Sequence, residues 1–519
     1  MSAAIQRLKQ AIAEKEKIVV YGDYDVDGLT ATAFLLRVLR EYTPNVVPFL
    51  PNRMDEGYGL SMEGLHRCLT THSPTLLIAI DCGTGSISEI AEARARGVDV
   101  IVLDHHQPSS HLPDCVAVVN PKHLAESPPW RDLCSAGLAF KFGHALLKSQ
   151  NSEPKAQSSL LKTHLDLAAL GTIADIVPLT GENRILTKAG LIQLGQTNKV
   201  GLQELMRKAQ MADGARIEPS HVGFRLGPRL NAAGRLGDAQ ASLELLLTDD
   251  GLRAKELAKL LDENNRQRQQ IEKRALEEAL VLLQDFDVSQ RVIVLAKEGW
   301  HIGVVGIVAA RIVREFYRPT VVIGIDEEGM GRGSCRSIEG FDIVEGLASC
   351  SDLLERFGGH QMAAGVSIHA KRVAEFRARL NATAEDQLSA DDLLPQLKVD
   401  AELSLLDTDE KLLNEIEQLE PFGQENPPPL FLARGVTIKS AATVGEEGRH
   451  LKLWLTDGKV TRQAIGFGLA TRCEWLGPFQ SQSSKTESRS LVDIVFTPEI
   501  NEFRDQRAIQ LNLKDIRPS

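Results

Sequence analysis

The sequence has few cysteines, few aromatic residues and no excess of positive charge, and each shortage excludes a class of protein. Its 519 residues include seven Cys, none at C-x-x-C spacing, which argues against a zinc ribbon or a thioredoxin-like pair. Scattered thiols fit a reducing compartment, so we expect a cytoplasmic protein. Aromatic residues make up 5% of the chain, too few for a broad stacking surface. Because the net charge is −11, any contact with nucleic acid must use a local basic groove.

Long hydrophobic runs are also missing. No stretch approaches the roughly 20 uninterrupted apolar residues that a membrane span requires. The first residues lack the apolar run of a signal peptide. The composition, 43% hydrophobic and 25% charged, is that of a globular protein. Its length predicts several domains, since a domain usually has about 100–200 residues.

The N-terminal part alternates short apolar runs with helical patterns. Strands are predicted at Lys17–Tyr21, Thr75–Ile80 and Val98–Leu103, with helices at Leu29–Tyr42 and Ser86–Arg96 between them. Strands that are apolar throughout and separated by helices indicate βαβ units and a parallel sheet.

The rest of the chain changes character twice. Residues 195–285 are mostly helical in pattern, and Leu252–Leu283 contains neither Gly nor Pro, which predicts one long helix joining two bodies. Strand and helix patterns alternate again over 288–385, and a Pro-rich break at Pro421–Pro429 precedes short runs typical of an all-β module. We predict domains at 1–195, 196–285, 286–390 and 391–519.

Acidic clusters follow three of the predicted strands. They are Asp23, Asp25 and Asp27; Asp81; and Asp104 with His105 and His106. Because the carboxyl ends of parallel strands share one edge of a sheet, the clusters should meet there. So many carboxylates need a counter-ion, and oxygen mixed with imidazole nitrogen suits Mn²⁺ better than Ca²⁺. A single Asp after a strand usually caps a helix, and Asp27 could do so, but three clusters together favour a two-metal site for phosphoryl chemistry.

The order of these motifs resembles the DHH phosphoesterase superfamily and, within it, the single-strand-specific exonucleases. The resemblance rests on GDYDVDGLTAT at 22–32, IDCG at 80–83, LDHHQP at 103–108, SAGLAFK at 135–141, ALGTIADIVPL at 169–179, GPRLNAAGRL at 227–236 and FGGHQMAAG at 357–365. It implies an α/β fold: a parallel-sheet DHH domain, joined by a long helix to a smaller α/β DHH-associated domain, then a β-rich OB-type domain. The family usually has a further N-terminal segment, so we expect that the start is truncated or misassigned.

The resemblance also implies roles for individual residues. Asp25, Asp27, Asp81, His105 and Asp175 would ligate metal. His106 would face the scissile phosphate, while Asp23 and Asp104 would orient the ligands or touch metal. Asp175 is identified by the family motif alone, since by residue pattern it is a plain surface Asp at the end of a helix.

Further residues are implied in gripping a nucleic-acid strand. Ser334 and Arg336 would bind the 5′ phosphate, Arg53, Arg229 and Arg235 would contact phosphates, and His360 would face the cleft. Taken singly, each Arg is as well explained by an ordinary ion pair. The segment 331–337 is predicted to be a glycine-rich turn able to form an anion nest, and the alternative for 358–360 is a tight turn. Trp454, Phe467 and Trp475 could stack bases, although alternation favours core packing for at least two.

The function that the resemblance implies is a single-stranded-DNA-specific 5′-to-3′ exonuclease, using two Mn²⁺ or Mg²⁺ ions in DNA recombination and repair. Single-strand-binding protein and a DNA helicase are the implied partners, and we expect a monomer. One alternative is an oligoribonuclease or cyclic-dinucleotide phosphodiesterase of the same superfamily, which is generally shorter and lacks the β-rich tail. The other alternative is an inactive scaffold at replication forks. The presence of a suitable residue at every expected metal-ligand position argues against it.

Overall fold

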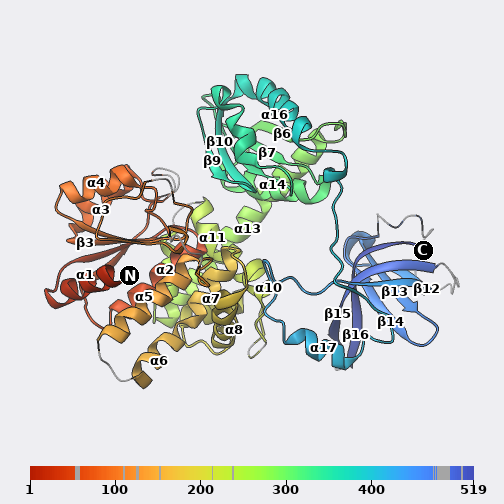
Figure 1. Ribbon diagram of the computed structural model, residues 1–519, viewed down its shortest axis with the longest axis horizontal. Coiled ribbons are helices and arrows are strands. Elements are labelled where there is room, and N and C mark those ends of the chain that lie inside the picture. The colour runs from red at the N-terminus through yellow and green to blue at the C-terminus, as the bar shows by residue number, and fades with distance from the viewer. Residues whose placement is uncertain are drawn as a thin grey trace. The chain divides into compact units, whose positions relative to one another are not determined.

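The chain forms two compact units, residues 1–395 and 396–519. Figure 1 shows a computed structural model, which describes all residues except 53–55, 57–58, 109–110, 124–127, 151–153, 213, 215, 237–238, 471–472, 474, 476–490 and 504–505. Among the described residues, no helix combines the length and the apolar character needed to cross a membrane.

The first unit begins with a five-stranded parallel sheet of order β2-β1-β3-β4-β5. Its strands are β1 (Ile18–Tyr21), β2 (Val46–Phe49), β3 (Leu76–Ile80), β4 (Asp99–Leu103) and β5 (Ala117–Val119). Alternate residues of β1 enter two separate cores: Ile18 and Val20 in one, Val19 and Tyr21 in the other. The sheet is therefore buried on both faces, as its uniformly apolar strands predict.

Helices cover both faces of this sheet. One core joins it to α1 (Ser2–Ala13), α2 (Val26–Leu39) and α5 (Ser135–Ser149), and the other to α3 (Met62–His72) and α4 (Ile87–Ala95). After α6 (Pro154–Thr163), α7 (Leu165–Ala174) packs against α2 and α5, and α8 (Gly181–Gly195) packs against α7. This arrangement brings the end of α7 to the carboxyl edge of the sheet.

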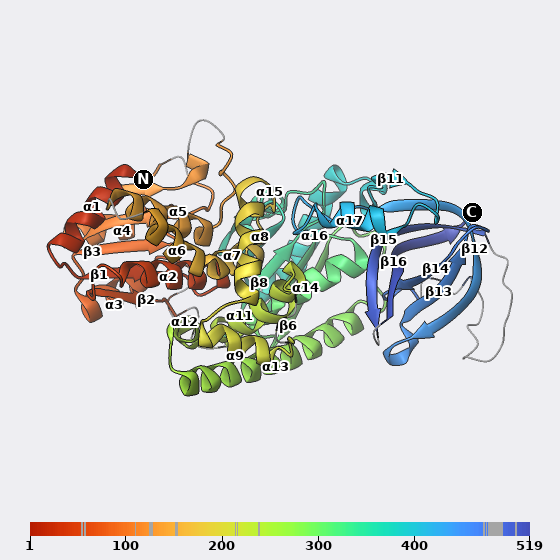
Figure 2. The ribbon, with the colours of Figure 1, turned by 90° about the horizontal axis from the view of Figure 1, so that it is seen from below.

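A helical segment follows, ending in one long helix. It contains α9 (Val200–Lys208), the short α10 (Pro219–His221) and η2 (Val222–Leu226), α11 (Gly227–Leu236), α12 (Gln240–Leu247) and α13 (Gly251–Leu282). Figure 2 shows α13 running beside α9 and α11, with which it is in contact. The prediction of a single long helix is confirmed.

The second sheet of this unit has the order β6-β7-β8-β10-β9 and is mixed. Its strands are β6 (Ile293–Glu298), β7 (Thr320–Ile325), β8 (Met330–Arg336), β9 (Arg356–His360) and β10 (Ala363–His369). One face packs against α14 (Ile302–Phe316) and the end of α13, and the other against α15 (Ile343–Ala348) and α16 (Val373–Gln387).

The second unit is a closed β-barrel preceded by β11 (Ala401–Glu402) and α17 (Glu410–Glu417). Its strands are β12 (Phe431–Val444), β13 (His450–Thr456), β14 (Thr461–Gly466), β15 (Leu491–Phe503) and β16 (Gln506–Pro518). Pairing of β12 with both β13 and β15 closes the sheet. A five-stranded barrel is the OB-type architecture. The predicted fold class is therefore confirmed.

Candidate active site

The first acidic cluster lies between β1 and α2. Asp25 is the residue that caps α2, since its Oδ1 accepts the N–H of Gly28 at 3.1 Å. Asp27 is buried, and its carboxylate accepts the N–H groups of Ser135 and Ala136 at 2.7 and 2.8 Å. Those groups begin α5, so the positive end of that helix dipole faces Asp27. The cap anticipated for Asp27 thus belongs to Asp25, and Asp27 points into the protein.

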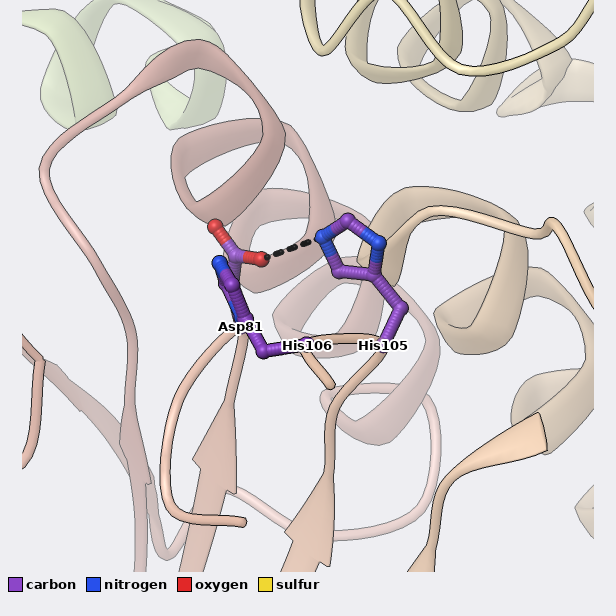
Figure 3. A group of neighbouring side chains, drawn as sticks. All are labelled: Asp81, His105 and His106. Atoms are coloured by element: carbon purple, nitrogen blue, oxygen red, sulfur yellow. Dashed lines mark ion pairs between the residues drawn. The ribbon is translucent and has the colours of Figure 1, made fainter. Parts of the chain in front are cut away.

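Side chains from separate elements converge on His105, which follows β4. Its Nε2 lies 3.4 Å from Asp81 Oδ1, 3.5 Å from Asp175 Oδ2 and 3.7 Å from Asp27 Oδ2. Figure 3 shows Asp81 and His105 pointing toward each other, with His106 beside them. Two groups, Asp81–His105–His106 and Asp27–His105–Asp175, each bring one ligand atom per residue within 4.8 Å of the others. The strand ends therefore meet as the parallel topology requires.

The donor atoms of this cluster fit a divalent cation. Both ring nitrogens of His105 and Oδ2 of Asp81 are buried without a hydrogen-bond partner among the described residues. Leaving such atoms unpaired is costly, and a cation would satisfy them. Carboxylate oxygen combined with imidazole nitrogen matches Mn²⁺ and related ions. Asp25 is in neither group of ligand atoms, although its charge raises the pKa of Asp27.

The protonation equilibria of the cluster are strongly displaced. Burial, with the nearby charge of Asp25, raises the pKa of Asp27 to about 6. Burial and the charge of Asp27 raise the pKa of Asp175 to about 9 and that of Asp81 well above its usual range. Burial also lowers the pKa of His105 to about 3. Without a cation, Asp175 holds a proton near neutral pH and His105 is neutral, so binding of metal by Asp175 must displace a proton.

Asp104 orients the two histidines. Its Oδ1 accepts the backbone N–H groups of His105 and His106, at 2.8 and 3.1 Å, and lies 2.7 Å from His106 Nδ1. Its Oδ2 accepts the N–H of Thr84 at 2.9 Å. Burial opposes ionisation of both side chains, but their mutual bond prevails: it raises the pKa of His106 to about 9 and holds that of Asp104 well below its usual range. His106 is therefore cationic at neutral pH, with its Nε2 directed away from Asp104. Asp23, also buried, accepts the N–H of its neighbour Tyr24 at 2.6 Å.

Asp175 reaches the cluster because α7 approaches α2 and α5 very closely. It caps the C-terminus of α7. At Gly171, one turn earlier, an added Cβ would lie 2.5 Å from Ala136 Cβ, 2.6 Å from Thr30 Oγ1 and 2.7 Å from Asp27 Oδ1. Only glycine allows the helices to come this close.

A cavity of about 510 Å³ lies between α11, α14 and the second sheet. Arg235, Arg332, Ser334 and Arg336 line it. Arg235 donates to the carbonyl of Gly303 at 3.0 Å, and Arg336 donates to Ser334 Oγ at 2.9 Å. Three guanidinium groups and a hydroxyl give this cavity the chemistry of a phosphate site.

The glycine-rich segments near this cavity are strands, so the predicted turn at 331–337 is wrong and the alternative of a tight turn at 358–360 is not seen. Residues 330–336 form β8, whose backbone pairs with β7 on one side and β10 on the other. A backbone anion nest is therefore excluded there, and anion binding must use the side chains. Residues 356–360 form β9, paired with β10.

The remaining predicted phosphate contacts lie in different settings. Arg229 donates to Asp262 at 3.0 Å and to the carbonyl of Arg225 at 2.7 Å, so it already has anionic and carbonyl partners. His360 is exposed to solvent on β9, and partial desolvation of its ring, together with the charge of His106, lowers its pKa. Arg53 lies outside the described residues.

The three aromatic residues considered for base stacking lie on the surface of the second unit. The exposed fractions are 44% for Trp454, 61% for Phe467 and 43% for Trp475. Core packing for at least two of them is therefore wrong. On β13 the neighbours Leu453 and Leu455 are fully buried, so Trp454 lies on the outer face.

Two residues that support the site were not found from the sequence. Ser135 donates its hydroxyl to Asp81 Oδ1 at 2.8 Å. Asn120 donates to Thr84 Oγ1 at 3.0 Å and to the carbonyl of His106 at 2.8 Å. The SAG motif that opens α5 was the available signal for Ser135, whereas Asn120 follows β5 without a distinctive pattern.

Comparison with known proteins identifies three domains along the chain. Residues 17–172 match the DHH family N-terminal domain, residues 289–386 the DHHA1 domain, and residues 399–515 the RecJ OB domain. The chain is 39% identical to the single-stranded-DNA-specific exonuclease RecJ of Bacillus subtilis, over 99% of this chain and 63% of that protein. It is 36% identical to RecJ of Dickeya dadantii, over 100% of this chain and 90% of that protein. A crystal structure of RecJ from Thermus thermophilus in complex with Mn²⁺ superposes with a TM-score of 0.82 at 33% identity, over 99% of this chain and 71% of that one.

The parallel sheet, its acidic rim and the associated domain define a protein of the DHH family. Because the chain also carries a RecJ OB domain and is similar to RecJ proteins along nearly its whole length, it belongs to the RecJ family. The family predicted from the sequence motifs is therefore confirmed.

Proposed function

We propose that this protein hydrolyses single-stranded DNA from its 5′ end in a reaction that depends on a divalent metal. The observation that carries the proposal is the convergence of Asp27, Asp81, His105 and Asp175 beside a cationic His106. The B. subtilis and D. dadantii relatives are named single-stranded-DNA-specific exonucleases, and the T. thermophilus relative was solved with Mn²⁺.

The metal ligands would be Asp25, Asp27, Asp81, His105 and Asp175, holding two Mn²⁺ or Mg²⁺ ions. When bound, such ions supply a water of lowered pKa and neutralise charge on the phosphoryl oxygens. The chain itself holds the ligands in place through the N–H groups of α5 and the hydroxyl of Ser135. These bonds keep the carboxylates oriented before substrate arrives, as effective catalysis requires.

His106 would act directly on the substrate. Because Asp104 accepts from Nδ1 and keeps the ring protonated, Nε2 is the nitrogen that can donate to a phosphoryl oxygen. A donor aimed at the charge that develops during hydrolysis stabilises the transition state. Asp104 and Asp23 would orient their neighbours from buried positions.

The cavity beside α11 would set the polarity of the reaction. Ser334 and Arg336, with Arg235 opposite, would bind a terminal 5′ phosphate, since guanidinium groups grip phosphate through paired hydrogen bonds. Arg53, Arg229 and His360 would contact the strand farther along. The exposed aromatics of the barrel would stack bases. Single-strand-binding protein and a helicase would supply single strands in recombination and repair, with the protein acting as a cytoplasmic monomer.

The test is a series of 5′-phosphorylated substrates of increasing length, with Mn²⁺ and the full-length protein. We expect kcat/KM to rise from a dinucleotide to a long single strand, and a blunt duplex of the same sequence to resist cleavage. An Asp81→Ala variant should be inactive on all of them. Activity that falls as the strand lengthens would instead identify a small-substrate phosphodiesterase. Mn²⁺ binding too weak to detect would identify an inactive scaffold.

A further inference from the structure

A residue 205 positions away in the sequence accepts a hydrogen bond from the first turn of α2. The first N–H groups of a helix have no partner within it and must find one outside. Asp25 accepts the N–H of Gly28, but the N–H of Val26 donates to the side-chain oxygen of Asn231 at 3.1 Å. Val26 lies between Asp25 and Asp27, so Asn231 fixes the backbone that presents both carboxylates.

The same helix that carries Asn231 also reaches the phosphate cavity. At Gly234 an added Cβ would lie 3.0 Å from the carbonyl oxygen of Tyr24, so α11 packs against the segment of residues 23–27, which joins β1 to the first turn of α2 and is called the acidic loop below. The next residue, Arg235, lines the cavity and donates to Gly303 at 3.0 Å. Within ten residues, α11 therefore contacts both the metal ligands' loop and the site expected to bind the 5′ phosphate.

We propose that Asn231 is a positioning residue that couples occupation of the phosphate cavity to the geometry of the acidic loop. This inference rests on the proposed function. A phosphate held by Arg235 keeps α11 where Asn231 meets Val26, and that bond aligns Asp25 and Asp27. A strand with a 5′ hydroxyl makes no such contact, so it reacts on a less well aligned site.

The experiment compares the full-length wild type with Asn231→Ala, Asn231→Gln and Asn231→Asp. Alanine removes the acceptor and glutamine displaces it by one methylene, whereas aspartate keeps an oxygen at the same reach with a charge that suits a helix N-terminus. The matched control is Asn381→Ala, because Asn381 of α16 accepts the N–H groups of Arg291 and Val292, just before β6, at 2.9 and 3.0 Å.

Two quantities are measured: Mn²⁺ affinity by electron paramagnetic resonance without DNA, and the ratio of kcat/KM for 5′-phosphate over 5′-hydroxyl strands. We expect Asn231→Ala and Asn231→Gln to weaken Mn²⁺ binding about 10-fold and to bring the ratio toward one. Asn231→Asp should stay near the wild type in both. Asn381→Ala should change neither.

Three results would overturn the inference. One is unchanged Mn²⁺ affinity in the folded glutamine variant. The second is an equal loss of kcat/KM on both strands, which marks a merely structural role, and the third is a wild-type ratio of one. If the wild type cleaves no DNA, the proposed function fails, while the Mn²⁺ titration still decides whether Asn231 positions the loop.

Discussion

Replacing Gly171 by alanine should damage the metal site although none of its ligands is replaced. The added Cβ would lie 2.7 Å from Asp27 Oδ1, whereas ordinary contacts begin at 3.4 Å, so the carboxylate must recede by about 0.7 Å. Sites of this kind tolerate roughly 0.5 Å of displacement. Overpacking of a tight core costs about 1–3 kcal/mol of unfolding free energy, and misplacement near 1 Å can lower the rate about 100-fold.

The assay measures denaturant unfolding, Mn²⁺ affinity and nuclease rate for Gly171→Ala beside Gly251→Ala. Gly251 begins α13, and an added Cβ there meets nothing within 4 Å, so that variant should match or exceed the wild type in stability. Normal Mn²⁺ affinity and rate in Gly171→Ala would refute the reasoning, because the helices would then have room that the structure denies them.

Three further outcomes are expected. Ser135→Ala removes the hydroxyl that donates to Asp81 but keeps the backbone N–H that donates to Asp27. It should weaken Mn²⁺ binding about 10–100-fold. Unchanged affinity in a Mn²⁺ titration would contradict this. Mn²⁺ binding should release protons near pH 7, because Asp175 has a pKa of about 9 and must lose its proton to bind the metal, so Mn²⁺ affinity should rise with pH up to about 9. Calorimetry in buffers of different ionisation enthalpy would count the protons released. A count of zero would argue against carboxyl ligands with raised pKa values. Trp454→Ala should weaken binding of single-stranded DNA by about 1–3 kcal/mol, the usual contribution of one stacked base. The loss of stability should be small, because the ring is 44% exposed. Equal DNA affinity of variant and wild type in a fluorescence titration would show that this ring stacks no base.

The convergence of the acidic clusters could be predicted from residues alone. Each apolar run was recognisable as a buried strand, and parallel strands necessarily share a carboxyl edge. That argument correctly brought Asp81 and His105 together, now seen 3.4 Å apart. It required no knowledge of side-chain packing.

Other parts of the site depend on tertiary contacts that no local pattern encodes. Asp175 joins the cluster because Gly171 lets α7 approach α2, and Asn231 caps a helix 205 residues away. For the same reason, the hydrogen bond of Ser135 to Asp81 could not be read from sequence spacing. Family motifs supplied Asp175, but the contacts that hold it came only from the structure.

The errors have a common physical origin. The glycines of 331–337 favour a turn by local propensity, yet pairing with β7 and β10 makes the segment a strand. Similarly, alternation in β13 marked two faces but could not say which faced the core, so core packing was wrongly favoured for at least two of Trp454, Phe467 and Trp475. In both cases long-range pairing decided the outcome.

The most direct test of the central claim follows a 3′-labelled single strand during incubation with Mn²⁺ and either the wild type or His105→Ala. His144→Ala, exposed on α5, is the matched control and should behave as the wild type. We predict labelled fragments that shorten stepwise from the 5′ side with the wild type and the control, and an intact strand with His105→Ala. Immediate release of labelled mononucleotide, or undiminished cleavage by His105→Ala, would contradict the account.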